Sequence, residues 1–134
     1  MEKIGIIGSG TWGTAIAVLL VNNGHEVTLW SAIPAEIEEM AKTRTHKNLP
    51  GVTLPEGIIY TADLEEAMKD KNLLVMAVPS VFVRSTAQKM KPFCKEGQLI
   101  VDVDRVGSTI QNLYLTGPTN IVCKGEVTDE ELKL

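Results

Sequence analysis

The chain has 134 residues, of which 44% are apolar and 22% charged, and its net charge is −4 at pH 7. This length fits one domain with a real core, and no apolar run approaches the ~20 residues that cross a bilayer. The acidic balance excludes nonspecific binding to nucleic acid, which needs clustered Lys and Arg. We expect a cytoplasmic protein without membrane contacts, because the first apolar run leads into glycines instead of a cleavage site.

The first predicted elements are a strand, a glycine turn and a helix. Residues 3–7 form a short apolar strand, residues 8–13 read Gly-Ser-Gly-Thr-Trp-Gly, and residues 14–21 give a long apolar helix face. Asn22-Asn23-Gly24 is a signal that ends a helix. A second strand is expected over residues 26–30, so strand, helix and strand follow one another within thirty residues.

The same alternation continues to about residue 103. The later elements are expected as a helix over 34–43, a strand over 58–61, a helix over 63–69 capped by Thr61 or Asp63, a strand over 73–78, a helix over 81–90 and a strand over 98–103. The run over 73–78 is the most apolar, which suits a strand buried on both faces of a parallel sheet. Five strands alternating with four helices predict an α/β fold, a Rossmann-type doubly wound parallel sheet with right-handed crossovers.

The last part of the chain follows a different pattern. Residues 113–116 and 120–127 look like two strands joined by Gly117-Pro118-Thr119, which is typical of a β-hairpin. We therefore expect a dinucleotide-binding domain over residues 1–103 and an atypical C-terminal extension, containing a β-hairpin, over residues 104–134.

The glycines of residues 8–13 form a G-x-G-x-x-G fingerprint between the first strand and the first helix. Gly8 would allow the tight turn, Gly10 would let a pyrophosphate approach the backbone, and Gly13 would let the helix pack closely on the strand. The phosphates would sit on N–H groups at the helix N-terminus, where the helix dipole favours negative charge. The alternative is that the glycines serve packing alone. Trp12 could flank the cofactor or pack on the helix.

The preference between NAD and NADP is not readable. An acidic residue at the end of the second strand would bond the ribose 2′-hydroxyl of NAD, and an Arg nearby would receive the 2′-phosphate of NADP. Here Trp30 is followed by Ser31 and Ala32, with neither group present. Glu36 and Glu38 come a few residues later, where we expect a solvated helix face.

A second group of candidate residues follows the fourth predicted strand, at the sheet edge where open α/β folds bind ligands. Ser80 is the natural N-cap of the next helix, and this interpretation is at least as good as a ligand role. Phe82, three residues after Pro79, could wall the nicotinamide or belong to the core, and we favour the wall. His25 and His46 have no carboxylate or nucleophile nearby in sequence, so we expect both to be structural or exposed.

No catalytic residue and no metal site are predicted. A Ser, His and Asp set or a pair of carboxylates cannot be placed. Cys94 and Cys123 are far apart and are not spaced as ligands with the two histidines, so we expect reduced, structural thiols.

Four ordered blocks, at residues 8–15, 23–30, 48–55 and 77–80, make the chain resemble NAD(P)-dependent glycerol-3-phosphate dehydrogenase. The resemblance covers residues 1 to about 103 and is far more specific than the fingerprint alone. It implies reversible hydride transfer between NAD(P)H and dihydroxyacetone phosphate, yielding sn-glycerol 3-phosphate for phospholipid synthesis. At matching positions it implies cofactor contacts from Gly8, Gly10, Thr11, Trp12, Gly13, Pro79 and Phe82.

The chain also departs from this family. Just after the fifth strand the family has a Lys-Gly that reaches cofactor and substrate, whereas this chain has Arg105, whose planar guanidinium keeps the charge but not the shape of an ammonium. The family's remaining Rossmann strands, its Ser-Gly-Pro segment and its substrate domain with the catalytic lysine are absent from these 134 residues. We therefore expect a truncated sheet that binds cofactor better than it turns over substrate.

The tail carries a second, shorter resemblance. Residues 113–127 resemble the closing hairpin of diaminopimelate epimerase, without either of that enzyme's two cysteine motifs, so no activity is implied. Our leading hypothesis is the dinucleotide domain of a glycerol-3-phosphate dehydrogenase. The alternatives are a module that holds NAD(P) without turnover and a chimeric structural or assembly protein. We expect a homo-oligomer, because a truncated sheet exposes apolar surface, and dihydroxyacetone phosphate as a partner only if another chain completes the site.

Overall fold

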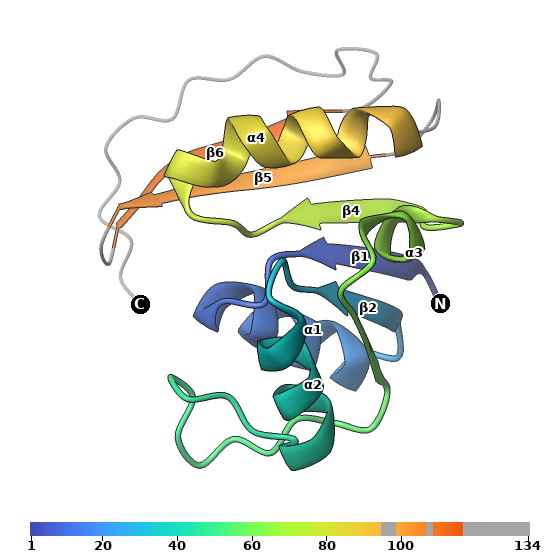
Figure 1. The fold of residues 1–134 in the computed structure, drawn as a ribbon, viewed down its shortest axis with the longest axis vertical. Coiled ribbons are helices and arrows are strands. Elements are labelled where there is room, and N and C mark those ends of the chain that lie inside the picture. The colour runs from blue at the N-terminus through green and yellow to red at the C-terminus, as the bar shows by residue number, and fades with distance from the viewer. Residues whose placement is uncertain (95–98, 107–108, 117–134) are drawn as a thin grey trace.

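The computed structural model describes residues 1–94, 99–106 and 109–116, with side chains described for residues 1–94. They form one sheet in the order β3-β2-β1-β4-β5-β6, with helices packed against it (Figure 1). In chain order the elements are β1 (Lys3–Ile7), α1 (Thr11–Asn22), β2 (Glu26–Trp30), α2 (Pro34–Thr43), β3 (Ile58–Thr61), α3 (Leu64–Met68), β4 (Leu73–Met76), α4 (Ser80–Met90), the 3₁₀ turn η1 (Lys91–Phe93), β5 (Leu99–Val106) and β6 (Thr109–Thr116).

The strand order confirms the predicted Rossmann-type fold. The strands from β1 to β5 pair in parallel, and β6 runs antiparallel to β5. The chain moves outward from β1 through β2 to β3, then returns to the other side of β1 for β4. In open α/β sheets a ligand crevice forms where the strand order reverses in this way, beyond the carboxyl ends of the strands.

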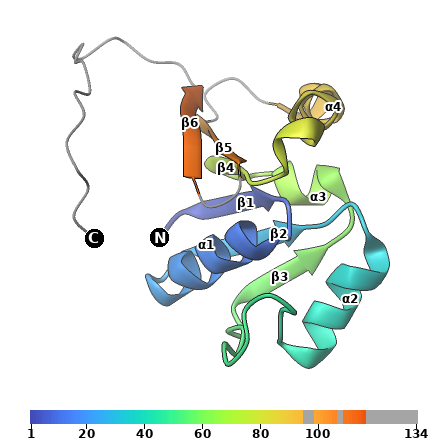
Figure 2. The ribbon, with the colours of Figure 1, turned by 90° about the vertical axis from the view of Figure 1, so that its left-hand side faces the viewer.

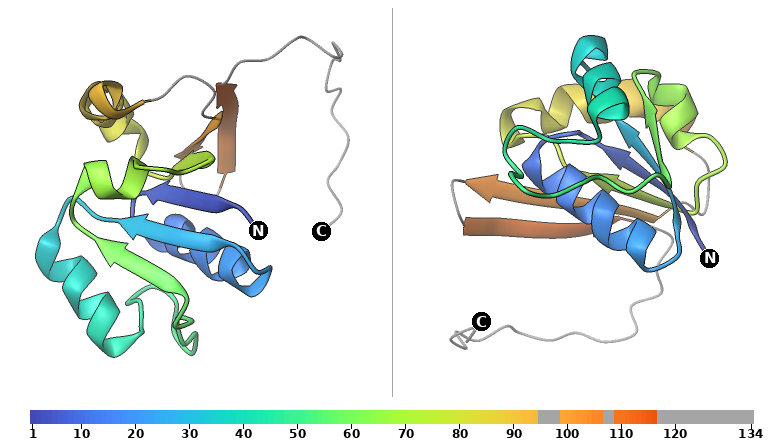
Figure 3. Two further views of the ribbon diagram at one scale, coloured as in Figure 1. Left: turned by 90° about the vertical axis from the view of Figure 1, so that its right-hand side faces the viewer. Right: turned by 90° about the horizontal axis from the view of Figure 1, so that it is seen from below.

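Both faces of the central strands are buried, which explains their continuous apolar sequences. On β1, Ile4 and Ile6 belong to one buried cluster, which includes Ala17 of α1, whereas Ile7 belongs to a second cluster, which includes Met68 of α3. Figure 2 shows α3 and α4 close together beside β4 and away from α1. Figure 3 shows β5 and β6 as a pair at one edge of the sheet, with α2 beside β3 at the other. The fold thus leaves the carboxyl ends of β1, β2 and β4 to form a site.

Most predicted elements agree with the structure, and the differences lie at their ends. The bounds expected for the elements at 3–7, 26–30, 34–43 and 58–61 match β1, β2, α2 and β3. By contrast, β4 ends at Met76, two residues earlier than predicted. Proline cannot donate a ladder hydrogen bond and restricts the residue before it, so the approach to Pro79 turns the chain out of the sheet.

Helix caps explain the differences among the helices. Gly10 is the N-cap of α1, which therefore begins at Thr11, before the predicted apolar face. Of the two predicted caps of α3, Asp63 is correct, since its Oδ1 accepts hydrogen bonds from the N–H groups of Glu65 (2.8 Å) and Glu66 (3.4 Å). The predicted capping role of Ser80 is wrong. Pro79 is the N-cap of α4, and Ser80, already helical, makes no capping bond.

The end of the described chain differs from the prediction as well. β5 continues to Val106, beyond the expected end at residue 103, and pairs with β6, which contains the predicted strand 113–116. The strand predicted at 120–127 lies outside the described residues, as does Cys123, and the side chain of Arg105 is not described. The hairpin over 113–127 and its resemblance therefore stay predictions. No helix in the described part of the chain is long and apolar enough to span a membrane.

Candidate cofactor-binding site

A cleft of about 480 Å³ opens at the carboxyl ends of β1, β2 and β4. One part of its lining is the turn after β1, with Gly8, Ser9 and Gly10, which we call the fingerprint end. A second part, the β2 end, consists of Ser31, Ala32, Ile33 and Glu36, together with Trp30. The third part is the wall made by residues 77–79 and by one face of α4: Phe82, Ser85, Thr86 and Lys89.

The three fingerprint glycines differ in what surrounds them. Gly8 has φ +121°, a conformation that favours glycine, and a Cβ there would lie 2.5 Å from the carbonyl oxygen of Ala77. A Cβ on Gly13 would overlap the carbonyl oxygen of Gly8. A Cβ on Gly10, however, would meet nothing within 4 Å. Packing therefore accounts for Gly8 and Gly13, whereas the space at Gly10 faces no other part of the described chain.

Helix α1 begins directly at this turn. Its N-cap, Gly10, makes no side-chain capping bond, and its carbonyl accepts the first helical hydrogen bond from the N–H of Thr14 (2.9 Å). The first N–H groups of a helix lack intrahelical acceptors and lie at the positive end of its dipole. The open backbone at Gly10 and this helix end together suit an anionic group such as a phosphate.

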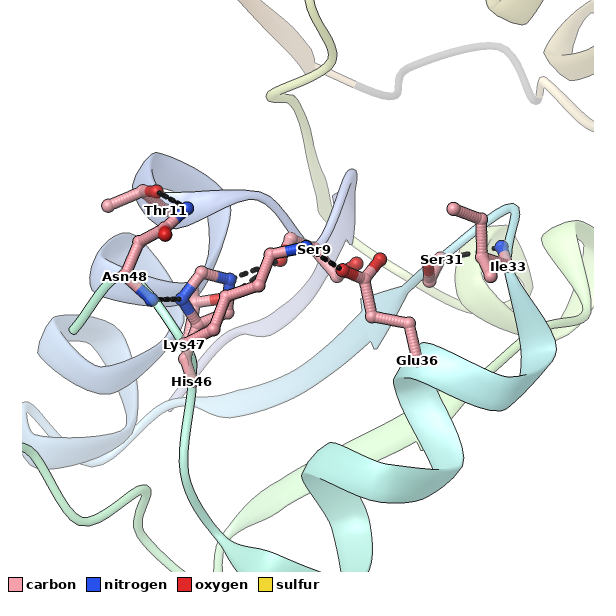
Figure 4. A network of polar contacts seen from close by, with 9 residues as sticks. Ser9, Thr11, Ser31, Ile33, Glu36, His46, Lys47 and Asn48 are labelled. Atoms are coloured by element: carbon pink, nitrogen blue, oxygen red, sulfur yellow. Dashed lines mark hydrogen bonds and ion pairs between the residues drawn. The ribbon is translucent and has the colours of Figure 1, made fainter. Parts of the chain in front are cut away.

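A loop far away in the sequence fastens the fingerprint end. His46 is buried, with 5% of its surface exposed, and its Nε2 lies 3.1 Å from the carbonyl oxygen of Ser9. Its Nδ1 accepts a hydrogen bond from the N–H of Asn48 (3.2 Å), so Nε2 carries the proton that is donated to Ser9. The Asn48 side chain donates to Thr11 Oγ1 (3.2 Å), and Figure 4 shows His46, Lys47 and Asn48 beside the turn. We call residues 46–48 the clip.

Sequence reasoning expected His46 to be structural or exposed, and the structure shows it to be structural. Its partner was missed because it lies 37 residues away and is a backbone carbonyl, which no sequence motif marks. His25 is half-buried in the turn before β2, where its Nδ1 accepts from the N–H of Glu2 (3.2 Å). Neither histidine contacts a side chain that could make an acid–base pair in these hydrogen bonds.

Side chains from two segments meet at the β2 end. Ser31 is buried, and its Oγ accepts a hydrogen bond from the N–H of Ile33 (3.2 Å). Glu36, in the first turn of α2, lines the cleft, and its carboxylate pairs with the Lys47 ammonium (3.2 Å; Figure 4). Glu38 is exposed, as expected for a solvated helix face, whereas Glu36 is half-buried and lines the cleft, because the first turn of α2 faces the end of β2.

The aromatic candidates separate in the structure. Phe82 is 57% exposed and lines the cleft beside Pro79, so it is not a core residue. Trp12 is 48% exposed at the start of α1 and is not among the residues that line the cleft. Trp30 lines the cleft from β2, is buried, and donates its indole N–H to the carbonyl of Ala62 (3.0 Å). In the described residues no three His, Cys, Asp or Glu side chains come together as a metal site would require.

The chain matches the family model of the N-terminus of NAD-dependent glycerol-3-phosphate dehydrogenase over residues 3–105. It is 53% identical over 103 residues to a glycerol-3-phosphate dehydrogenase [NAD(P)+] of Lactobacillus delbrueckii, covering 77% of this chain and 31% of that protein. The corresponding protein of Agathobacter rectalis is 55% identical over 104 residues, with the same coverage of both chains. This chain therefore spans about a third of the length of these relatives.

Solved structures of the same enzyme are similar in fold. Glycerol-3-phosphate dehydrogenase from Coxiella burnetii superposes with a TM-score of 0.73 at 28% identity, covering 78% of this chain and 32% of that chain. The enzyme from Saccharomyces cerevisiae gives a TM-score of 0.67, also at 28% identity, covering 82% of this chain and 36% of that chain. In both cases the part that matches is the dinucleotide-binding fold described above.

Proposed function

The chain belongs to the NAD-dependent glycerol-3-phosphate dehydrogenase family, whose N-terminal dinucleotide-binding domain it forms, and we propose that it holds NAD(P)H for hydride transfer to dihydroxyacetone phosphate. Its cofactor is NAD or NADP. The observation that carries the proposal is Gly10. Among the three fingerprint glycines, this one has open space around its absent side chain, at the N-terminus of α1, where a pyrophosphate must come close to the backbone.

The proposed cofactor contacts follow the three parts of the lining. We assign the pyrophosphate to the fingerprint end and the first turn of α1, with contacts from Gly8, Gly10, Thr11, Trp12 and Gly13. The adenosine ribose would lie at the β2 end, where the second strand of such folds meets it. Pro79 and Phe82, which line the opposite wall, would border the nicotinamide.

Substrate turnover is proposed only for a more complete protein. Hydride transfer to a carbonyl needs a proton donor within ~3 Å of the substrate oxygen, and we assign no side chain of the described residues to that role. We propose that dihydroxyacetone phosphate binds when a further domain or another chain completes the site, and that the product, sn-glycerol 3-phosphate, serves phospholipid synthesis. The relatives, about two and a half times as long, are named for this activity.

Cofactor binding is tested by titrating the chain with NADH and NADPH while following Trp30 and Trp12 fluorescence and energy transfer to the nicotinamide. We expect saturable quenching, because Trp30 lines the cleft. The control is Gly10→Val, whose Cβ enters open space, and it should remain folded by circular dichroism while losing binding. Equal binding by Gly10→Val would contradict the assignment of the pyrophosphate.

A second assay separates the enzyme from its alternatives. Oxidation of NADH on addition of dihydroxyacetone phosphate would show that this chain alone is an enzyme. Saturable cofactor binding without oxidation is what we expect, and it describes a domain that needs completion or a binding module that acts without turnover. Failure to bind either cofactor, together with a concentration-dependent oligomer, would favour a structural or assembly protein.

Two further properties of the protein are proposed, its location and its assembly. We propose a cytoplasmic location for this domain. We also propose self-association as a homo-oligomer, because Trp12, Val81 and Phe82 expose apolar side chains, Val81 to 79%. Sedimentation velocity at increasing concentration tests this, and a constant monomer at high concentration would contradict it.

A further inference from the structure

Glu36, at the β2 end of the cleft, forms a charge pair with Lys47, and the described side chains form no such pair at the fingerprint end. Glu36 and Lys47 come from α2 and from the clip, eleven residues apart, and their charged atoms lie 3.2 Å apart. The side chain of Glu36 is 29% exposed and lines the cleft, whereas that of Lys47 is 73% exposed. A pair this exposed adds little to folding stability, so stability alone does not explain its position at the cleft.

The position matters because the two nicotinamide cofactors differ at a single group. NAD has a ribose 2′-hydroxyl, which can donate a hydrogen bond to a carboxylate. NADP has a 2′-phosphate instead, which a carboxylate repels and a cation attracts. The residues that usually make this choice directly after β2 are here Ser31 and Ala32, which carry no charge. The Ser31 hydroxyl already accepts a bond from the N–H of Ile33.

We propose that Glu36 and Lys47 together set the cofactor preference of this domain. In the NAD complex Glu36 accepts a hydrogen bond from the ribose 2′-hydroxyl while Lys47 neutralises its charge. In the NADP complex Lys47 leaves Glu36 and pairs with the 2′-phosphate. Lys47 can make this exchange because its side chain is largely solvated and its present bond is a surface pair. The pair therefore lets one site accept either cofactor, an inference that rests on the cofactor lying in this cleft as proposed above.

Other charged groups near the cleft must be considered. Among the residues that line the cleft, Glu36 and Lys89 of α4 are charged, whereas Lys47 lines a neighbouring hollow beside α2 together with Glu36. Lys89 comes from the opposite wall, whereas Lys47 is held beside the β2 end by the clip, whose His46 and Asn48 are tied to the fingerprint turn. The hydrogen bonds of His46 and Asn48 thus hold Lys47, which lies between them in sequence, next to Glu36.

The experiment compares dissociation constants for NADH and NADPH in five charge variants, Lys89→Gln among them, measured by fluorescence titration at low salt. Glu36→Gln should lower the dissociation constant for NADPH about fivefold, because the carboxylate no longer repels the 2′-phosphate and Lys47 is released. The dissociation constant for NADH should stay within about twofold. Lys47→Gln should weaken NADPH about fivefold and leave NADH little changed. The matched controls, Glu38→Gln and Lys42→Gln, change the same charges on exposed residues of α2 and should leave the ratio of the two constants unchanged.

The outcomes separate this inference from the proposed function. If neither cofactor binds the unmodified chain, the proposed function fails. If both bind and the ratio is the same in Glu36→Gln, Lys47→Gln and the controls, the inference is wrong while the function stands. A ratio that changes in Lys89→Gln but not in Lys47→Gln would also overturn it, because the 2′-phosphate would then lie at the α4 wall. A purely structural role for the pair would weaken both cofactors equally.

Discussion

At the fingerprint end of the cleft the chain presents backbone, and at the β2 end it presents side chains. Gly8, Ser9 and Gly10 are consecutive, and their conformation follows from one turn between β1 and α1. At the β2 end, Ser31 comes from the segment after a strand and Glu36 from a helix, and Lys47, which pairs with Glu36, comes from a loop. The cofactor's pyrophosphate is common to NAD and NADP, whereas its 2′ group is not. The fingerprint end is therefore suited to binding both cofactors, and the β2 end is suited to discriminating between them.

The clip connects the two ends. His46 and Asn48 bond to the fingerprint turn, and Lys47, between them, reaches Glu36. Substitutions in the clip should therefore act differently according to which end the substituted residue contacts. These effects are separated by measuring, for each variant, the free energy of unfolding, the two cofactor affinities and the ratio of the dissociation constants for NADPH and NADH.

The largest effect is expected from glycine substitutions at the fingerprint end. Gly13→Ala places a Cβ on the carbonyl of Gly8, which is backbone and cannot move aside, so the free energy of unfolding should fall by about 3 kcal/mol or more. Gly10→Ala makes the same chemical change in open space, so it should cost about 1 kcal/mol or less, as a poorer helix N-cap, while weakening the binding of both cofactors at least about tenfold. Urea denaturation and titration measure the two quantities. Similar unfolding midpoints for the two variants would contradict the packing argument.

The next effect concerns the clip. His46→Ala removes a buried hydrogen-bonded side chain, so unfolding should become easier by about 2 kcal/mol. The affinities for NADH and NADPH should fall by the same factor, because Ser9 belongs to the end that both cofactors share. His25→Ala is the control, since that histidine bonds to Glu2, on the amino-terminal side of β1. A change in the ratio of the NADPH and NADH dissociation constants in His46→Ala would contradict the proposal that the fingerprint end contributes equally to the binding of both cofactors.

A smaller effect is expected outside both ends, at Tyr60 on β3. Its hydroxyl is buried without a hydrogen-bond partner among the described residues, so Tyr60→Phe should stabilise the fold by about 1 kcal/mol and leave both affinities unchanged. Burial raises the pKa of Tyr60 above 10.0, with Arg44 opposing the shift. The neutral phenol is therefore favoured by folding. This contribution is complete below pH 10 and is lost as the pH rises through the raised pKa.

Alkaline denaturation of the two proteins measures this effect. The stability of the unmodified chain should decline more steeply above pH 10 than that of Tyr60→Phe. Parallel declines would mean that the Tyr60 phenol ionises as easily in the folded chain as in the unfolded one.

The smallest effect is the response to salt. In the proposed complex the 2′-phosphate of NADPH lies near the exposed Lys47. Salt screens the attraction between these charges, so it should weaken the binding of NADPH more than that of NADH. Between 50 and 300 mM salt we expect the ratio of the dissociation constants to change by about twofold, and in Lys47→Gln this change should disappear. An equal response of both cofactors in the unmodified chain would argue against a charge contact at the 2′ group.

The same contrast determines how much could be predicted from the sequence. The fingerprint end is local, so a strand, three glycines and a helix in sequence were enough to predict its turn and its place in a Rossmann-type sheet. The bounds of β2, α2 and β3 were also predicted, because Gly24, Pro34 and short apolar runs mark them. Local signals of this kind act within a few residues along the chain.

The β2 end and the clip could not be predicted in the same way. The exposure of Glu36 depends on how the first turn of α2 lies against β2, and the partner of His46 is a carbonyl 37 residues away. Ser80 shows a related limit, because Ser is a good N-cap in general, yet here Pro79 takes that position and the serine falls inside the helix. Long-range contacts and the exact start of a helix depend on tertiary packing. Tertiary packing cannot be predicted from the types of the residues and their spacing in the sequence.

The most direct test of the account is to follow backbone amide signals by two-dimensional NMR while NADH is added. If the pyrophosphate lies against the fingerprint end, the amides of Gly8, Gly10 and Thr11 should shift and saturate together, and that of Ile59, exposed on the edge strand β3, should not move. Addition of NADPH should reproduce these shifts and add one at Lys47. Saturable binding that leaves the fingerprint amides unchanged would contradict the central claim that the backbone of this turn holds the cofactor.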